Sequence, residues 1–458
     1  MNECRTDNTS CYIFPYTINY QREKMDELYA DKVLPTANIQ PTIHNRFPTE
    51  KISLVDHSIE KIEPCVIFPE STDLNQKSSI EFVIHESSQY YIDLSSLQLE
   101  VTLSLHLANG NVVPDGASVY FTNNLLSSLF PIRKSFINNV CVETQYSGHH
   151  IGRIKQLLYA KNDLTANRGQ SRGLFVLDPA RLSSPIDTNT CNSNPDRVIF
   201  AKKGLIHLKG YLEMDICGIN MWLLDLLTYR LVLEAAPDNL VINSKDNAIA
   251  YKIKIHSLKL HCNRIKPTHA GFLTATKKIQ KSPFEYMFTR HIVHSELLSA
   301  NQSLLTINRP FTSRIPHLLY IFMVKQSGDT GAYNEDSGYY QTNGLTNYRI
   351  MIDGKLLIDQ DLSPDNDAVS AYVNSLTAHN NSEYFVPFNM YTKGCFLLVV
   401  KTNHSQESEI SFTRKGNLSI HLKFGRNIVE NQIVYVIGKC HSAFEVTADR
   451  NIITNYSY

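Results

Sequence analysis

Two histidine pairs contain the side chains most often found at metal sites. His291 and His294 lie three residues apart, and His149 and His150 are neighbours before a segment with helical spacing. A zinc site needs three or four ligands, so either pair would need partners from elsewhere in the chain. We interpret His291 and His294 as solvent-facing or loop side chains, and His149–His150 as part of a solvated helix N-terminus.

Two further groups combine histidine with cysteine in predicted strands. They are His261 with Cys262, and Cys440 with His441. Neighbouring side chains in a strand point to opposite faces of the sheet, so the two members of a pair are poorly placed to bind one ion. The pattern favours cysteines buried as small hydrophobic residues.

Two pairs of closely spaced carboxylates in the second half of the chain are candidate sites. Asp359 with Asp361 and Asp365 with Asp367 could belong to a calcium loop or a glycosidase pair. Pro364 intervenes, and the glycine and terminal glutamate of an EF-hand are missing, so neither assignment is favoured.

Known catalytic fingerprints are missing from the sequence. It has no glycine-rich phosphate loop, no Gly-x-Ser-x-Gly elbow and no His-Glu-x-x-His motif. We therefore predict that the protein is not an enzyme, and we assign no catalytic, cofactor-binding or metal residue and no cofactor.

Length and charge limit the possible classes of protein. A chain of 458 residues exceeds what one hydrophobic core usually serves, so two domains are expected. The 44 Lys and Arg residues balance 44 Asp and Glu residues, so no global field attracts nucleic acid or an anionic membrane.

Neither a membrane-spanning segment nor a signal peptide is predicted. No apolar run is long enough to span a bilayer, and residues 1–20 include Glu3, Arg5 and Asp7. The nine cysteines are scattered, odd in number and without a Cys-x-x-Cys pair, which argues against a disulfide framework. These features favour synthesis in a reducing compartment.

The strongest structural signal is a strand over residues 96–107. Leucine or valine alternates there with polar residues without a break, which places one face on a core and the other toward water or a polar neighbour. Such a strand needs a second layer of sheet to cover its leucine face.

Most of the remaining periodic segments also predict strands. The predicted strands are residues 80–84, 91–92, 129–137, 140–142, 198–201, 205–212, 229–235, 252–262, 317–325, 347–352, 355–358, 396–401, 409–413, 418–424 and 432–446. Residues 151–160 have helical spacing, and a short helix is possible at 22–29. Polar loops are predicted at 163–197, 326–344 and 363–382, and 267–309 contains a connecting piece near 271–279.

The two halves repeat one order of elements. The hairpin Ile137-Asn138-Asn139-Val140 matches Ile352-Asp353-Gly354-Lys355 at an offset of 215. The segment 229–235 matches 418–424 at an offset of 189, and 253–255 matches 433–435 at an offset of 180. We therefore predict an internal duplication whose first copy has longer loops.

These observations predict an all-β chain of two consecutive jelly-roll β-sandwiches, a double jelly roll with a minor helix and long loops. The expected units are an N-terminal arm at residues 1–79, a first jelly roll at 80–265, and a second jelly roll with a C-terminal tail at 266–458.

The order of motifs resembles the hexon-like, double jelly-roll major capsid proteins of the Maverick/Polinton and adintovirus group. The matching segments are residues 80–84, 91–95, 97–107, 123–130, 137–139, 223–224, 229–233, 251–255, 281–284, 352–354, 416–418 and 435–451. They cover about residue 80 to the C-terminus. The sequence departs from the family at 86–89 and at Asn139, where more glycine is expected.

This resemblance implies a structural subunit of a virion capsid. It implies a homotrimer with a pseudo-hexameric outline that tiles an icosahedral shell around double-stranded DNA, contacting neighbouring capsomers and penton or minor capsid proteins, and the DNA only indirectly. The long loops and both ends of the chain are candidate contact surfaces. The alternatives are a minor or penton-like capsid protein, which generally needs one jelly roll, and a carbohydrate-binding or carbohydrate-active β-sandwich, which predicts secretion and an acidic cleft.

Overall fold

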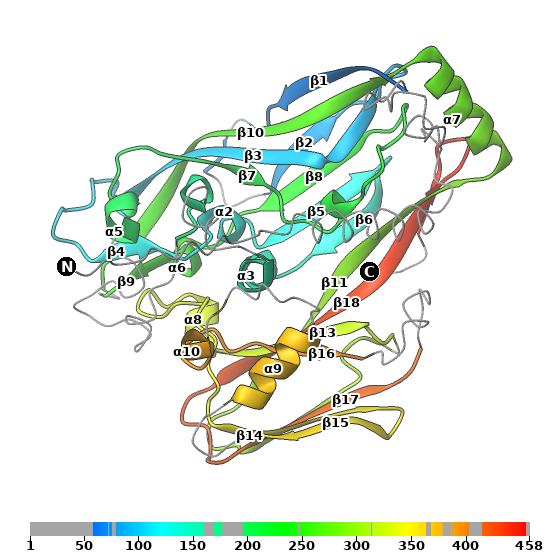
Figure 1. Ribbon diagram of the computed structural model, residues 1–458. Helices are drawn as coiled ribbons and strands as arrows, with labels where there is room; N and C mark the ends of the chain where they lie inside the picture. Colours follow the sequence, from blue (N-terminus) through cyan, green and yellow to red (C-terminus); the bar gives the residue numbers. More distant parts are fainter. Residues whose placement is uncertain are drawn as a thin grey trace, which may run out of the picture.

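The structure is a computed structural model, and its strands form two similar sandwiches (Figure 1). It describes residues 58–71, 73–75, 79–159, 169–175, 196–245, 248–312, 314–362, 368–378, 386, 388–402 and 415–454. The possible helix at 22–29, the predicted strand at 409–413, Asp365 and Asp367 lie outside the described residues.

Strand β3 (Tyr91–Leu107) is the strand predicted at residues 96–107, and it extends further toward the N-terminus. Its apolar face is buried along most of its length, since Leu97, Leu99 and Leu103 are all 0% exposed. Its polar face carries cross-strand pairs, in which Lys259 and His261 contact the Glu100 carboxylate at 2.9 and 2.8 Å. The alternation in sequence therefore corresponds to a core face and a polar face.

The first sandwich consists of two four-stranded antiparallel sheets. One has the order β1 (Ile59–Ile67), β10 (Tyr251–Pro267), β3 and β7 (Ile206–Tyr211). The other has the order β2 (Ser79–Ile84), β8 (Tyr229–Glu234), β5 (Ile132–Ile137) and β6 (Val140–Gln145). A short pair, β4 (Val119–Phe121) and β9 (Ile242–Ser244), lies outside them. Residues 59–67 fall within the segment assigned from sequence to the N-terminal arm, but they form the strand β1 beside β10.

The second sandwich repeats this arrangement. One sheet has the order β11 (Phe284–Leu298), β18 (Gln432–Val446), β13 (Leu318–Lys325) and β16 (Leu398–Lys401), with β19 (Ile452–Thr454) beside β18. The other has the order β12 (Leu304–Asn308), β17 (Leu418–Phe424), β14 (Leu345–Ile352) and β15 (Lys355–Asp361).

The two sandwiches match strand for strand. Numbering eight strands along each copy gives the sheet orders 1-8-3-6 and 2-7-4-5 in both, which is a jelly roll. The segments matched by offset in sequence are equivalent strands, since β5–β6 corresponds to β14–β15, β8 to β17, and β10 to β18. The predicted duplication and the double jelly-roll fold are therefore confirmed.

Each sandwich has its own hydrophobic core, and each core receives side chains from the other half of the chain. The second core contains Ile151, Ile154, Leu157 and Leu158 of α3 (Gly148–Tyr159). The first core contains Phe284, Tyr286, Phe288, Phe444 and Val446 of β11 and β18. Figure 1 shows β11 and β18 running from α7 beside the first sandwich down into the second. The two units are therefore joined by shared apolar packing.

Helices connect the strands at several places. They are α2 (Leu125–Ser128), α3, α5 (Asp196–Ala201), α6 (Asp238–Val241), α7 (His269–Lys281), α8 (Gln326–Thr330), α9 (Val369–Ala378) and α10 (Phe388–Tyr391), with 3-10 turns η1 (Gly169–Arg172) and η3 (Ile216–Gly218). Within the described ranges, no helix combines the length and apolar character needed to cross a bilayer.

Three local predictions from the sequence are wrong. Residues 198–201 form part of helix α5, where Phe200 packs on Phe175 at a centroid distance of 5.3 Å and Ile199 is 63% exposed. The predicted loops at 326–344 and 363–382 contain α8 and α9. A short apolar run such as 198–201 does not distinguish a strand from a turn of buried helix. In the predicted loop 363–382, the low number of charged residues at 369–378 does not exclude a helix.

The region 267–309, interpreted only as a connecting piece, contains α7, β11 and β12. Helix α7 begins after Thr268, whose hydroxyl accepts a hydrogen bond from the Gly271 amide at 3.3 Å. Lys278 and Lys281 lie in its last turn, where their positive charges interact favourably with the negative end of the helix dipole.

The two predicted hairpins have the same turn geometry. Asn138 and Asn139 have φ of 45° and 66°, and Asp353 and Gly354 have φ of 50° and 75°. Two consecutive positive φ values define a type I′ turn, which matches the twist of the flanking strands. Asn138 also links distant segments, since its amide side chain accepts from the Thr228 amide at 2.9 Å and donates to the Arg450 carbonyl at 3.0 Å.

Because of these contacts, the two turn residues should respond differently to substitution. We expect Asn138→Ala to lower the free energy of unfolding by about 1–3 kcal/mol, since it loses two hydrogen bonds and places alanine at positive φ. Asn139→Gly should change it by less than about 0.5 kcal/mol or stabilise the turn. Urea unfolding of both variants beside the wild type measures the difference, and equal effects would contradict this assignment.

Candidate functional site

Among the described residues, the junction between the two sandwiches contains the main group of buried polar and charged side chains. Helix α3 follows β6 in the first sandwich and packs its apolar side on the second (Figure 1). Ile151, Ile154 and Leu158 recur at helical spacing and are at most 2% exposed. Each contributes roughly 1.5–3 kcal/mol through burial, so the predicted helix at 151–160 anchors one jelly roll on the other.

The opposite side of α3 faces the first sandwich at very close range. Gly152 leaves no room for a side chain, because a Cβ there would overlap the Ser127 hydroxyl and the Glu213 carboxylate and lie 2.9 Å from the Ser127 Cβ. Helix α3 can therefore lie between the two units only because this residue is glycine.

The histidine pair at the start of α3 is buried, so its assignment to a solvated helix N-terminus is wrong. The side chains of His149 and His150 are 10% and 1% exposed. His150 Nε2 lies 2.9 Å from Asp329 Oδ1, and its Nδ1 lies 3.1 Å from the Tyr340 hydroxyl. The Tyr435 hydroxyl donates to Asp329 Oδ2 at 2.8 Å. The start of α3 would be solvated in an isolated helix, but in the folded chain the second sandwich covers it.

Burial and charge determine the protonation states in this cluster. Burial lowers the pKa of His150 to about 4; the neighbouring His149 also lowers it, and Asp329 only partly opposes them. Burial raises the pKa of Asp329, but its interactions with the two imidazoles outweigh burial and hold that pKa well below its usual range. At neutral pH the cluster therefore contains a neutral imidazole and a carboxylate.

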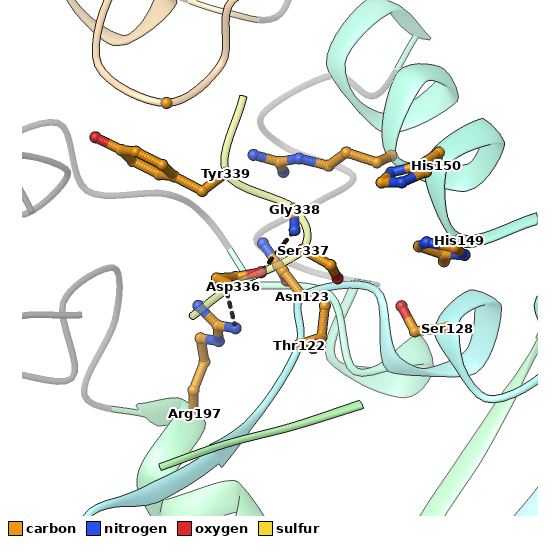
Figure 2. Close-up of a pocket in the computed structure, with 12 residues that line it drawn as sticks. Thr122, Asn123, Ser128, His149, His150, Arg197, Asp336, Ser337, Gly338 and Tyr339 are labelled. Atoms are coloured by element: carbon orange, nitrogen blue, oxygen red, sulfur yellow. Dashed lines mark hydrogen bonds and ion pairs between the residues drawn. The ribbon is translucent and has the colours of Figure 1, made fainter. Parts of the chain in front are cut away.

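A cavity of about 40 Å³ adjoins the histidine pair. Figure 2 shows residues from several elements around it, including His149, Asn123 and Tyr339, and an ion pair between Arg197 and Asp336 at 3.7 Å. The volume suits one or two water molecules or an ion, and it is far below that of a typical substrate pocket.

His291 forms a second polar link across the junction. Asp215, which precedes η3 of the first sandwich, accepts from the His291 amide and contacts His291 Nδ1, both at 2.7 Å. The His291 side chain is 8% exposed, so its interpretation as a solvent-facing or loop residue is wrong. His294 is 28% exposed and lies 3.4 Å from Glu296, so the structure does not bring this pair together at a shared site.

Asp215 and Glu143 form a tightly coupled buried pair of carboxyl groups. Burial and, to a smaller extent, the charge of Asp215 together raise the pKa of Glu143 to about 7. Burial also raises the pKa of Asp215, but His291 and Lys155 outweigh this and lower it. Glu143 accepts hydrogen bonds from the amides of Asp215 and Ile216 at 2.8 and 2.9 Å, so it orients η3 beneath His291.

A third polar link comes from the end of the chain. The Arg450 guanidinium, beyond β18, donates to Asp225 of the first sandwich through Nη2 at 2.6 Å and through Nε to the Asp225 carbonyl at 2.9 Å. The Asp225 side chain is only 4% exposed. A buried pair with this geometry fixes the relative orientation of the two units more than it adds stability.

In each histidine–cysteine pair, the two side chains point to opposite faces of their sheet, as predicted. Cys262 and Cys440 are 2% and 3% exposed and face the interior. His261 contacts Glu100 on the polar face of the first sandwich. His441 stacks on His317 at a ring-centroid distance of 4.3 Å. Neither pair offers two ligands to one ion.

Asp359 and Asp361 share one face of β15 and have protein partners. Asn347 donates to both carboxylates at 2.9 Å, and Arg349 pairs with Asp359 at 2.6 Å. These contacts place the pair in the cross-strand packing of an exposed sheet face.

Sequence reasoning did not identify Asp329, Tyr340 and Tyr435 as partners of the histidine pair. They follow His150 by 179, 190 and 285 residues, and no local spacing links positions so far apart. The available signal was the unbroken apolar run 318–324, which indicates a strand buried on both faces and hence a covering element.

The tight approach at Gly152 can be tested directly. We expect Gly152→Ala to lower the free energy of unfolding by about 1–3 kcal/mol, because the new methyl group must displace Ser127 or Glu213. Gly204→Ala is the matched control, since a Cβ there meets nothing within 4 Å. If both variants unfold at the same urea concentration as the wild type, α3 does not lie as closely against the first sandwich as described.

His317 should make the stability of the fold sensitive to acid. Burial, with smaller contributions from the charges of His441, Lys439, His291 and Lys401, lowers the pKa of His317 to about 3. The unfolded chain then takes up this proton near pH 6.5, so stability is lost as the pH falls from there toward 3. We expect the wild type to lose up to about 2 kcal/mol more than His317→Asn between about pH 7 and about pH 5. Parallel urea titrations at the two pH values measure this, and identical pH dependence of the two proteins would contradict it.

Comparison with known proteins gives a consistent account of the fold. No family model and no curated protein sequence matches the chain. A chain of the Sputnik virophage structure is similar with a TM-score of 0.56 at 12% identity, covering 90% of this chain and 92% of that one. The mavirus major capsid protein has a TM-score of 0.55 at 11% identity over 99% and 97% of the two chains, and the Faustovirus major capsid protein has 0.53 at 9% over 93% and 97%. The chain therefore has the double jelly-roll fold of these viral capsid proteins.

Proposed function

We propose that this chain is the structural major capsid protein of an icosahedral virus or virus-like element, and that three copies form a pseudo-hexameric capsomer. The observation that carries the proposal is the strand-for-strand repeat of the two sandwiches in one chain. Three such chains place six similar units around one axis, and a hexagonal outline is what packs a shell with few gaps. The similar mavirus and Faustovirus chains are major capsid proteins, which supports the same role.

The junction inside the chain suggests how the contact between chains is made. Helix α3 lies between β6 and β7, and its counterpart α9 lies between the equivalent strands β15 and β16. Within its own sandwich, α9 is held by Ser375, which donates to the Leu397 carbonyl at 3.2 Å and accepts from the Val399 amide at 3.1 Å. Val369 and Val373 remain 42% and 49% exposed. In a closed ring of six units, α9 would face the first jelly roll of the next chain, as α3 faces the second jelly roll of its own.

We further propose the units and partners that follow from this role. The boundary between the two jelly rolls lies near residue 265, as the sequence suggested. Strand β1 belongs to the first jelly roll, and the N-terminal arm precedes β1. Neighbouring capsomers and penton or minor capsid proteins are the partners, and contact with DNA is indirect because the net charge is zero. The order of motifs supports membership of the Maverick/Polinton and adintovirus group, a location in the virion, and the absence of enzymatic activity.

Substitution on α9 tests the assembly. The wild-type chain should elute in size-exclusion chromatography with light scattering at three times its mass of 52.1 kDa. Val373→Asp should shift it toward the monomer by weakening the trimer about tenfold or more, because a carboxylate would be buried in the contact without a partner. Ile453→Asp is the control, since Ile453 is similarly exposed at 52% but lies on β19 at the far end of β18.

Electron microscopy of the same samples gives the second result. Six-sided particles or closed shells from the wild type and from Ile453→Asp, but not from Val373→Asp, would support the proposal. A wild-type chain that stays monomeric at high concentration and forms no particles would overturn it.

A further inference from the structure

We propose that His149, His150 and Asp329 bind a divalent transition-metal ion of the zinc class, which clamps the two jelly rolls together. The site joins the start of α3 to α8, so its ligands come from both halves of the chain. The inference does not depend on the capsid function, because it rests on the donor atoms alone.

The three donor atoms already converge. One ligand atom of each residue lies within 4.8 Å of the other two. Asp329 Oδ1 is 2.9 Å from His150 Nε2 and 3.9 Å from His149 Nε2. Ligands bound at about 2.0–2.2 Å around tetrahedral zinc lie roughly 3.3 Å apart, so small side-chain rotations would complete the geometry.

His149 supplies an independent sign of a missing ligand. Its side chain is 10% exposed, and neither ring nitrogen has a hydrogen-bond partner among the described residues. A buried polar group without a partner costs about 1–3 kcal/mol. An ion bound between Nε2 of His149 and Asp329 would remove this cost, and no protein group in the described part of the chain does so.

The surrounding hydroxyl groups support the ligands as they do at known metal centres. Tyr435 donates to Asp329 Oδ2 at 2.8 Å and leaves Oδ1 for the ion. The Tyr340 hydroxyl lies 3.1 Å from His150 Nδ1, so its oxygen can accept a hydrogen bond from Nδ1–H when Nε2 binds metal. Partners of this kind fix the tautomer of a ligating histidine and orient a ligating carboxylate.

The donor set determines the class of ion. Two imidazole nitrogens and one carboxylate oxygen suit zinc, cobalt or nickel, whereas magnesium and calcium prefer oxygen alone. Three protein ligands leave one position of a tetrahedral site open. The adjoining cavity of about 40 Å³, which both histidines line, has room for a water molecule at that position (Figure 2).

Metal content and thermal stability of the full-length protein test the site. After metal removal and dialysis against zinc sulfate, we expect the wild type to retain one more zinc ion per chain than His149→Ala, by elemental analysis. Its thermal midpoint should rise with zinc, since an ion that binds only the folded state stabilises it. His149→Ala should lose this rise relative to its own metal-free midpoint, which is lower than that of the wild type because a buried ring 4.0 Å from the His150 ring is removed.

Two further variants complete the zinc-binding test. His85→Ala removes an exposed histidine and should retain zinc and the rise in midpoint like the wild type. Tyr435→Phe keeps all three ligands but should weaken zinc binding by about tenfold or more, because Asp329 loses its orienting hydrogen bond. Cobalt binding to the wild type should give the visible absorption of a tetrahedral site. Equal zinc retention by the wild type and His149→Ala, or no zinc bound by the wild type, would overturn the proposal.

Discussion

The packing of α3 on the outer face of β13 and β18 is the contact on which the arrangement of the two jelly rolls depends. On β3, the equivalent strand of the first copy, buried and half-buried residues alternate, but on β13 every residue from Leu318 to Val324 is buried. One face of β13 lies on its own core. On the other face, the His150 ring of α3 contacts the rings of Phe322 and Tyr435 at centroid distances of 5.0 and 4.5 Å. Without the helix, Tyr435 and part of Phe322 would lose this cover, and an exposed apolar patch on the sheet would be prone to aggregate.

Buried charged and polar groups at the junction fix the relative orientation of the two units in this apolar contact. Each charged or polar link joins one defined residue of the first sandwich to one of the second: His150 to Asp329, Asp215 to His291, and Asp225 to Arg450. Apolar packing alone would tolerate sliding of the helix along the sheet. Sliding would leave these groups buried without partners at a cost of several kcal/mol, so the links select one orientation.

The regular strands and turns could be predicted from the sequence because their signals are local. The alternation at 96–107 identified β3, and the Asn-Asn and Asp-Gly pairs identified both hairpins and, through them, the duplication. The environment of His149 and His150 could not be predicted, because the element that covers them begins more than 150 residues later in the chain. Helix α5 was misassigned for a related reason, since its few apolar residues have no period long enough to distinguish helix from strand.

The pairing of β1 with β10 determines the order in which this chain can fold. Ile59 lies opposite Pro267, so the first sandwich cannot close its sheet until more than 200 residues have left the ribosome. Helix α3 must then wait for β18, whose last residue is Val446, before its apolar side is covered. During synthesis the chain therefore carries an exposed amphipathic helix for most of its length. We expect its folding to be slow and to depend on protection from self-association until β18 is made.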